Sequence, residues 1–145
     1  MRQAIKRTGK KGSRTSKRRK LRKASAQRCN DLWSRYIKRH GVCEFIGEQI
    51  GLEVHTTCKG SLQAMHGFGK KTYPAVRYAV WNGFCGCAAA HSYYTWREPE
   101  WQNVLRVRWG NEVYEQRLRD AILTRKHDFE EIAASLRMAL GCEGF

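Results

Sequence analysis

The stretch from Gln63 to His91 contains side chains of the kinds that do chemistry in proteins. His66 and His91 lie near its two ends, and Asn82 lies between them. A neutral imidazole, whose pKa is ordinarily about 6.5, can accept a proton from water at cellular pH or bind a metal ion. An asparagine amide both donates and accepts hydrogen bonds, so it can fix the position of its neighbours. The pattern fits a metal centre, and it also fits an ordinary patch of core.

Cysteines supply a second kind of ligand. The chain has six of them: Cys29, Cys43, Cys58, Cys85, Cys87 and Cys142. No apolar run reaches the roughly 18 residues of a membrane span, and no signal-peptide core follows the basic start. We therefore expect a soluble, intracellular protein without membrane contact. In a reducing compartment, cysteines act as metal ligands or buried thiols and do not build a disulfide framework.

The elements that position these residues follow from the sequence pattern. Residues 61–66 and 73–81 have the composition of strands, and the glycine-bearing basic segment between them predicts a hairpin or a broad loop. A short helix is expected to begin near Cys87. Residues 42–60 predict a strand or an irregular loop that is held by a ligand at each end.

Helices are predicted on both sides of this stretch. Apolar residues at steps of three and four predict a helix over about residues 16–39. Pro99 suits the first turn of a later helix, where its missing N–H costs nothing. Gly110 ends that helix, and another follows it. Asp128, with Glu131 three residues later, is typical of the capped start of a last helix.

The order and spacing of these residues resemble the HNH endonucleases, in particular the small phage-type members of this ββα-metal (His-Me finger) superfamily. Their central motifs read LQ-x-x-H, then R-x-x-x-x-N, then C-x-x-C-H or a close relative. The matching residues here are Leu62, Gln63, His66, Arg77, Asn82, Cys87 and His91. The flanking sequences are similar too, so the resemblance covers roughly residues 31–140. It implies an α+β fold in one domain of residues 17–145, with a ββα-metal (HNH) core at about 43–96 flanked by helices, the C-terminal ones at 98–141.

The resemblance implies metal-dependent hydrolysis of DNA phosphodiester bonds. By this resemblance His66 is the general base that takes a proton from the attacking water, and Asn82 orients it. His91 would hold the catalytic divalent cation, Mg²⁺ or Mn²⁺, which stabilises charge on the leaving oxygen. Arg77 would clamp a DNA phosphate. Phage-type relatives imply a role in phage DNA recombination, processing or packaging, in the cytoplasm of a bacterial host.

A structural zinc site is a further expectation from the resemblance, since relatives often tie this region together with two C-x-x-C pairs. The four candidate ligands are Cys43, Cys58, Cys85 and Cys87. Ala90 stands where the last cysteine of the second pair would be, and His55, three residues before Cys58, is a rival ligand. Two alternatives stay open: buried free thiols, and zinc ligation by Cys87 together with His91 on one helix face.

Positive charge is concentrated at the N-terminus. The formal net charge is +15, and twelve of the first 25 residues are Lys or Arg, with none acidic. A block of like charge without apolar periodicity cannot bury enough surface to fold alone, so residues 1–16 are expected to form a disordered basic arm. DNA phosphates are its natural partner. Lys70 and Lys71, in the loop between the predicted strands, are further candidates for DNA contact.

Non-catalytic binding is the competing function. In many HNH nucleases an Asp or His precedes the general base and binds the metal, whereas Met65 stands here, and a thioether is a poor ligand for Mg²⁺. Met65 and Ala90 favour a zinc-stabilised nucleic-acid-binding protein without catalysis. The presence of His66, Asn82 and His91 together favours the nuclease, because binding alone needs none of them. A basic RNA-binding protein is a third hypothesis, and the sequence carries no signal for an oligomeric state.

Overall fold

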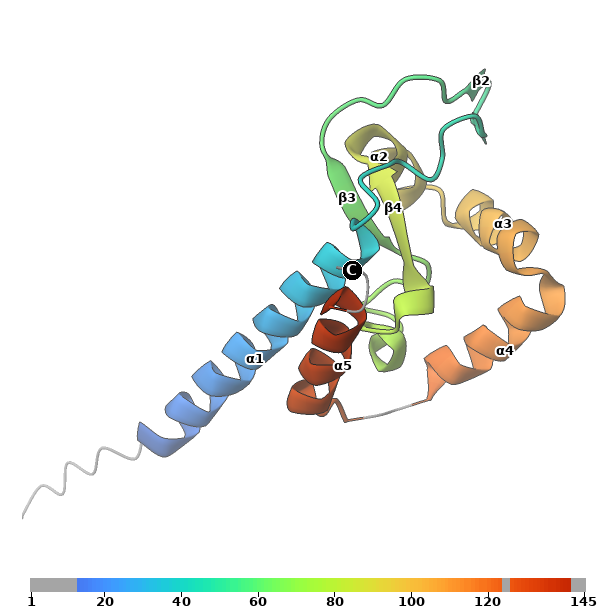
Figure 1. The fold of residues 1–145 in the computed structure, drawn as a ribbon. Helices are drawn as coiled ribbons and strands as arrows, with labels where there is room; N and C mark the ends of the chain where they lie inside the picture. The colour runs from blue at the N-terminus through green and yellow to red at the C-terminus, as the bar shows by residue number, and fades with distance from the viewer. Residues whose placement is uncertain (1–12, 124–125, 142–145) are drawn as a thin grey trace, which may run out of the picture.

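A hairpin of two strands with a helix directly after it lies at the centre of the structure (Figure 1). The computed structural model describes residues 13–123 and 126–141. The elements in chain order are α1 (Ser13–Ile37), β1 (Gln49–Ile50), β2 (Glu53–Val54), β3 (Leu62–His66), the 3₁₀ turns η1 (Pro74–Val76) and η2 (Val80–Asn82), β4 (Gly83–Cys87), α2 (Ala88–Thr95), α3 (Glu98–Trp109), α4 (Asn111–Ile122) and α5 (Phe129–Gly141). The protein is mixed α and β, with two small antiparallel sheets, β1–β2 and β3–β4. None of the described helices is both long and apolar enough to cross a membrane.

The central hairpin agrees with the sequence pattern in part. β3 and β4 pair antiparallel, with His66 opposite Gly83 at one end of the register. The expected strand at 61–66 is confirmed, and so is the expected helix start near Cys87, which is the residue directly before α2. The helix therefore leaves the hairpin immediately, and its residues stay close to both strands.

Residues 73–81 do not form the strand that their composition predicts. The two 3₁₀ turns η1 and η2 occupy this segment, and β4 begins only after them. Pro74 cannot donate a hydrogen bond to a sheet, and it favours a turn. The buried side-chain amide of Asn82 accounts for the rest, because it donates to the carbonyl oxygens of Phe68 and Val76 and draws the segment into a loop around itself.

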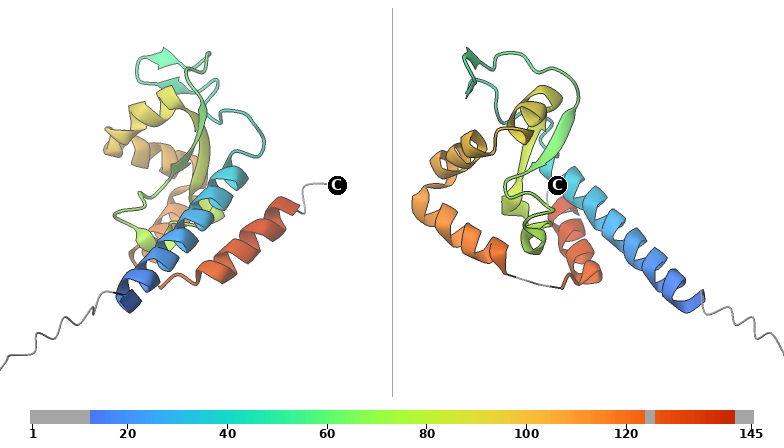
Figure 2. Two further views of the ribbon diagram at one scale, coloured as in Figure 1. Left: turned by 90° about the vertical axis from the view of Figure 1, so that its left-hand side faces the viewer. Right: turned by 180° about the vertical axis from the view of Figure 1, so that it is seen from behind.

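Helix α1 packs against α5 and also contacts both strands of the hairpin; Figure 2 shows α1 and α5 from two further sides. Helix α1 begins at Ser13, three residues before the predicted start, and residues 1–12 of the predicted arm lie outside the described part of the chain. Its second half buries Trp33 and Ile37 in the core beneath it. Gly83 permits this close approach, because a Cβ at that position would overlap the side chain of Ile37.

A second core lies under α3 and α4. Its members include Phe45, Phe84, Trp101, Leu105 and Tyr114. Pro99 stands in the first turn of α3, as expected. Gly110, at a φ of 80° that favours glycine, ends α3 and lets α4 start at once. The predicted cap of α5 is confirmed, because Asp128 Oδ1 accepts the N–H groups of Glu130 and Glu131 at 3.0 and 3.1 Å.

Residues 42–60 form an irregular excursion that carries the short β1–β2 hairpin. The backbone N–H of His55 donates to Glu48 O at 2.8 Å and closes the base of this hairpin. The start of the excursion is fastened to β4, since Glu44 N donates to Cys85 O at 2.8 Å and Glu44 Oε1 accepts the N–H of Cys85 at 2.7 Å. The other end is held at the start of α2, where Ala89 N donates to Lys59 O at 3.1 Å, so both ends lie near the end of β4.

Candidate active site and metal centre

A cavity of about 360 Å³ beside the end of β3 brings together the two histidines of the predicted site. His66 is the last residue of β3, and His91 lies on α2. Lys70 and Lys71, from the loop between the strands, line the same cavity. Two imidazoles and two ammonium groups are therefore available to one anionic group that enters this space.

His66 is held in one orientation by its surroundings. Its Nε2–H donates to Arg77 O at 3.1 Å, and its ring stacks on Trp33 with centroids 4.1 Å apart. Since a carbonyl oxygen can only accept, the proton sits on Nε2, and Nδ1 keeps its lone pair. Burial lowers the pKa of His66 to about 4, although its hydrogen bond to the Arg77 carbonyl acts in the opposite direction. The ring is thus a neutral proton acceptor at physiological pH.

Asn82 is fully buried and ties the loop between the strands together. Its Oδ1 accepts the N–H of Phe68 at 2.6 Å, and its Nδ2 donates to Phe68 O and Val76 O, both at 3.1 Å. Val76 directly precedes Arg77, whose carbonyl oxygen holds His66. Asn82 therefore fixes the peptide next to the one that orients the imidazole, which is a positioning role.

In His91 the nitrogen with the free lone pair is Nε2, whereas in His66 it is Nδ1. The Nδ1 of His91 lies 2.6 Å from Oε1 of Gln63, an oxygen that can only accept, so Nδ1 carries the proton. The lone pair is then on Nε2, which is free to bind a cation. Burial, and then the charge of Lys70, lower the pKa of His91, so this ring is also kept neutral.

The structure separates Arg77 from the other predicted DNA contacts. Its Nε donates to Oδ1 of Asn30 on α1 at 3.2 Å, and it is not among the described residues that line the cavity. Its backbone carbonyl takes part in the site, whereas its guanidinium holds α1. Lys70 and Lys71 are the cations from this set that reach the cavity.

The cavity offers a sparse donor set for a catalytic cation. Among the described residues it contains no cluster of three His, Cys, Asp or Glu side chains. Met65 is buried, and its sulfur packs against Gly86 in the core. His91 and the carboxylate of Glu98 are available in the lining. Mg²⁺ commonly keeps several waters and binds substrate phosphate, so a divalent cation held here would depend on such ligands in addition to His91 and Glu98.

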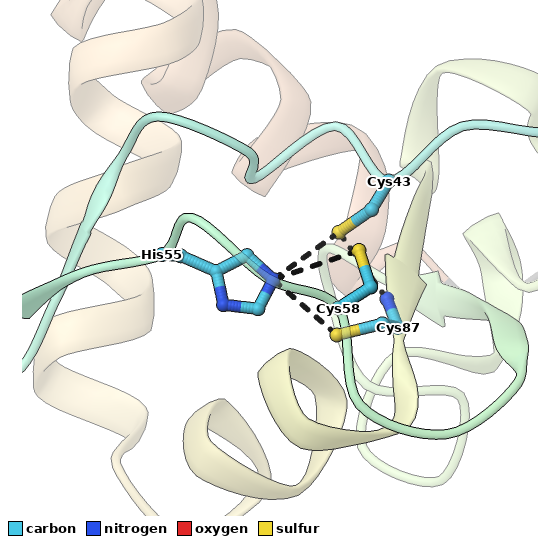
Figure 3. A group of neighbouring side chains, drawn as sticks. All are labelled: Cys43, His55, Cys58 and Cys87. Atoms are coloured by element: carbon cyan, nitrogen blue, oxygen red, sulfur yellow. Dashed lines mark hydrogen bonds between the residues drawn. The ribbon is translucent and has the colours of Figure 1, made fainter.

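A separate group of four side chains converges at the end of β4 (Figure 3). Its members are Cys43, His55, Cys58 and Cys87, and their ligand atoms all lie within 4.8 Å of one another. They come from the two ends of the excursion, from the residue after β2, and from the junction of β4 with α2. This candidate metal centre is distinct from the cavity of the two histidines.

Three distances within this group lie within a few tenths of an ångström of those around a tetrahedral zinc ion. His55 Nε2 lies 3.8 Å from the sulfur of Cys43, 3.9 Å from Cys58 and 3.4 Å from Cys87. One ring nitrogen carries at most one hydrogen, so it cannot donate to three sulfurs. Zn–S bonds of about 2.3 Å and Zn–N bonds of about 2.0 Å place tetrahedral ligands roughly 3.5–3.8 Å apart. A shared cation would satisfy all four ligand atoms at once.

Cys87 has the surroundings of a metal-bound thiolate. Burial raises the pKa of this thiol, but hydrogen bonding by the backbone at Ala90, Lys59 and Ala89 lowers it, and the net shift is downward. Its own N–H donates to the sulfur of Cys43 at 3.3 Å. Donors aimed at sulfur stabilise negative charge there.

Two of the zinc alternatives are corrected by this geometry. Cys85 was expected as a ligand, but it is buried in the core under α1 and α5, and burial raises the pKa of its thiol. His55 takes the fourth position, and its spacing from Cys58, His-x-x-Cys, was the signal for it. Cys87 and His91 do not share a metal site, since His91 points to Gln63 and the cavity. The buried-thiol alternative holds for Cys29 and Cys85.

Comparisons with known protein families, curated proteins and solved structures returned no match for this chain. Its function must therefore follow from the geometry and chemistry of the two sites.

Proposed function

We propose that this chain is a metal-dependent endonuclease of the HNH type that hydrolyses DNA phosphodiester bonds. The observation that carries the proposal is the pair of neutral histidines on one cavity. His66 keeps a free Nδ1, and His91 keeps a free Nε2. Hydrolysis needs both functions, a base for water and a ligand for the cation that stabilises the leaving oxygen. The antiparallel hairpin followed at once by a helix supports the same assignment.

The residues of the cavity have different roles in the proposed hydrolysis. Lys70 and Lys71 attract the phosphate and hold its non-bridging oxygens. His66 Nδ1 accepts the proton of the attacking water, while Arg77 O keeps the imidazole in place. Negative charge on the bound phosphate raises the pKa of His66 from its low value in the free protein toward the range useful for a general base. A divalent cation, when held by His91, supplies positive charge beside the departing oxygen.

The second metal centre has a structural role in this proposal. Three cysteines and one histidine form a closed four-ligand set, which is typical of structural zinc and leaves no position for substrate. The ion would join the excursion of residues 42–60 to the start of α2, the helix that carries His91. Because such a site rarely forms in the unfolded chain, its binding free energy contributes to folding.

Plasmid nicking tests the catalytic proposal. Supercoiled DNA is incubated with the protein in buffer without divalent cation, with Mg²⁺ or with Mn²⁺. We expect cation-dependent nicking by the wild type and at least a roughly hundredfold loss in His66→Ala, the usual scale for a general base. His40→Ala, which changes an exposed histidine just after α1, is the matched control and should nick normally.

Binding without nicking would instead identify the non-catalytic, zinc-stabilised nucleic-acid-binding protein. The presence of Met65 favours that second function, because this position lacks a carboxylate or imidazole that could bind the catalytic metal. Normal nicking by His66→Ala would assign the base to another residue.

A further inference from the structure

A second cavity lies between α1 and the segment just before α5. It has a volume of about 680 Å³ and is lined by Thr15, Arg18, Arg19, Leu21, Arg22, Ser25, Lys126, His127 and Phe129. Four of these residues are Arg or Lys, and none of the described lining residues is acidic. We call this feature the basic groove.

The first half of α1 lies outside the protein core. Residues 14–24 are all exposed, and seven of them are Lys or Arg. The helix has no acidic residue in its first turn, and the positive end of the helix dipole lies there, so neither of these offsets the charge. In Figures 1 and 2 this half extends past the rest of the fold. A polar helix that projects into water is suited to a partner of opposite charge.

Acidic residues close to the basic groove have other partners. Asp128 Oδ1 accepts the N–H groups of Glu130 and Glu131 at the start of α5. Glu130 forms an ion pair with Arg28, which lies three residues after Ser25 on α1. Within the described part of the chain, none of the four cations that line the groove forms an ion pair with an acidic side chain, so they are available to a ligand from outside.

Contacts along α1 connect the basic groove to the catalytic cavity. Trp33 stacks on His66, and further toward the N-terminus Ala26 O accepts the hydroxyl of Tyr78 at 3.3 Å. The ring of Tyr78 meets His127 edge-on at 5.0 Å, and His127 Nε2–H donates to Pro74 O at 2.8 Å. The segment at 126–127 is thus fixed to the same loop that orients His66.

Helix geometry gives the spacing between the two sites. Arg22 and Arg18 are eleven and fifteen residues before Trp33, which corresponds to about 16 and 22 Å along the axis at about 1.5 Å per residue. A DNA duplex that runs along α1 rises about 3.4 Å per base pair. The basic groove would then meet the backbone roughly five to seven base pairs from the phosphate held near His66.

We propose that the basic groove binds the sugar-phosphate backbone of duplex DNA on one flank of the cleavage position, and that α1 sets the distance between the two contacts. This inference rests on the proposed nuclease function for the identity of the partner. It differs from a diffuse electrostatic anchor because it assigns the contact to one face of α1. Residues 18, 19 and 22 lie on that face, whereas residues 17, 20 and 23 lie on the other.

Two matched triple variants test the assignment. The groove variant carries Arg18→Gln, Arg19→Gln and Arg22→Gln. The control variant carries Lys17→Gln, Lys20→Gln and Lys23→Gln, which removes the same charge from the same turns of the helix. Glutamine is a good helix former, so both should keep α1 intact. Binding to a labelled 30-base-pair DNA duplex is measured without Mg²⁺ over a range of salt concentrations.

We expect the groove variant to bind at least roughly tenfold more weakly at 0.1 M salt and to lose up to about 2.7 from the slope of log K against log salt, near 0.9 for each lost phosphate contact. The control variant should lose less than half as much. Equal losses in both variants, or no loss in the groove variant, would overturn the inference. Tighter binding to an RNA duplex than to DNA would overturn it too.

The same variants separate this inference from the nuclease proposal. If the wild type fails to nick plasmid but the groove variant alone loses DNA binding, the result supports DNA binding by the basic groove and contradicts the nuclease proposal. If the wild type nicks and the two variants bind DNA equally well, the result supports the nuclease proposal and contradicts DNA binding by the basic groove.

Discussion

The imidazole of His66 lies flat against the indole of Trp33, with ring centroids 4.1 Å apart and 16° between the ring planes. Trp33 is itself fixed, because its Nε1–H donates to Ala79 O at 3.1 Å. The helix α1 therefore covers the proposed general base on one side and removes water from it. This contact explains the direction of its pKa shift, since burial disfavours the charged form of histidine.

A low pKa at His66 predicts a specific pH dependence of folding stability. The folded-state pKa is about 4 and the ordinary value is 6.5, so the unfolded chain binds more protons between these values. The contribution of His66 to the free energy of unfolding is complete above about pH 6.5 and is lost as the pH falls to 4 and below, at most about 3 kcal/mol in all.

The measurement compares urea unfolding of the wild type and His66→Gln at several pH values. Unfolding free energy should fall more steeply with acid in the wild type, and ring-proton NMR should show His66 titrating near pH 4. His40→Gln is the matched substitution. Parallel curves for the wild type and His66→Gln would contradict the buried, neutral imidazole.

Asn82 offers a test of the positioning role. In Asn82→Asp, the carboxylate can still accept the Phe68 N–H but can no longer donate to the carbonyl oxygens of Phe68 and Val76. Leaving buried acceptors unpaired costs about 1–3 kcal/mol each. We expect a loss of roughly 3 kcal/mol in unfolding free energy, together with slower nicking.

Asn103→Asp makes the same chemical change on the exposed side of α3 and should alter stability by less than about 0.5 kcal/mol. Unchanged stability in Asn82→Asp would show that the amide does not support the loop.

Zinc content separates the four proposed ligands from the other cysteines. Protein dialysed extensively against metal-free buffer should retain about one zinc ion per chain by elemental analysis. Cys58→Ser should lose the ion and lower the Tm by at least roughly 10 °C, because zinc binding contributes to folding. Cys58 is exposed, so this change creates no cavity that could explain the loss.

Cys85→Ser is the control for Cys58→Ser, since it changes a buried thiol on the same strand as Cys87. It should retain zinc in full and lose only about 1–2 kcal/mol from the core. Zinc-free wild type, or loss of zinc in Cys85→Ser but not in Cys58→Ser, would refute the assignment.

Local sequence signals were enough for much of the fold. Helical periodicity, Pro99, Gly110 and the Asp128 cap predicted the flanking helices within a few residues, because each depends on neighbours along the chain. The strand expected at 73–81 failed for the opposite reason. Its composition suits a sheet, but the Asn82 amide binds Phe68, fourteen residues away, and the sequence does not display that contact.

The sequence by itself determined which chemical groups the protein has, among them His66, Asn82 and His91 in that order, six cysteines, and a strongly basic first segment. Only the tertiary structure decided which of them meet. It placed His55 with three cysteines and left Cys85 in the core, and it turned the Arg77 side chain toward α1. It also aligned the cations of α1 with Lys126. The physical reason is that ligand type is a property of one residue, whereas convergence depends on how distant segments pack against each other.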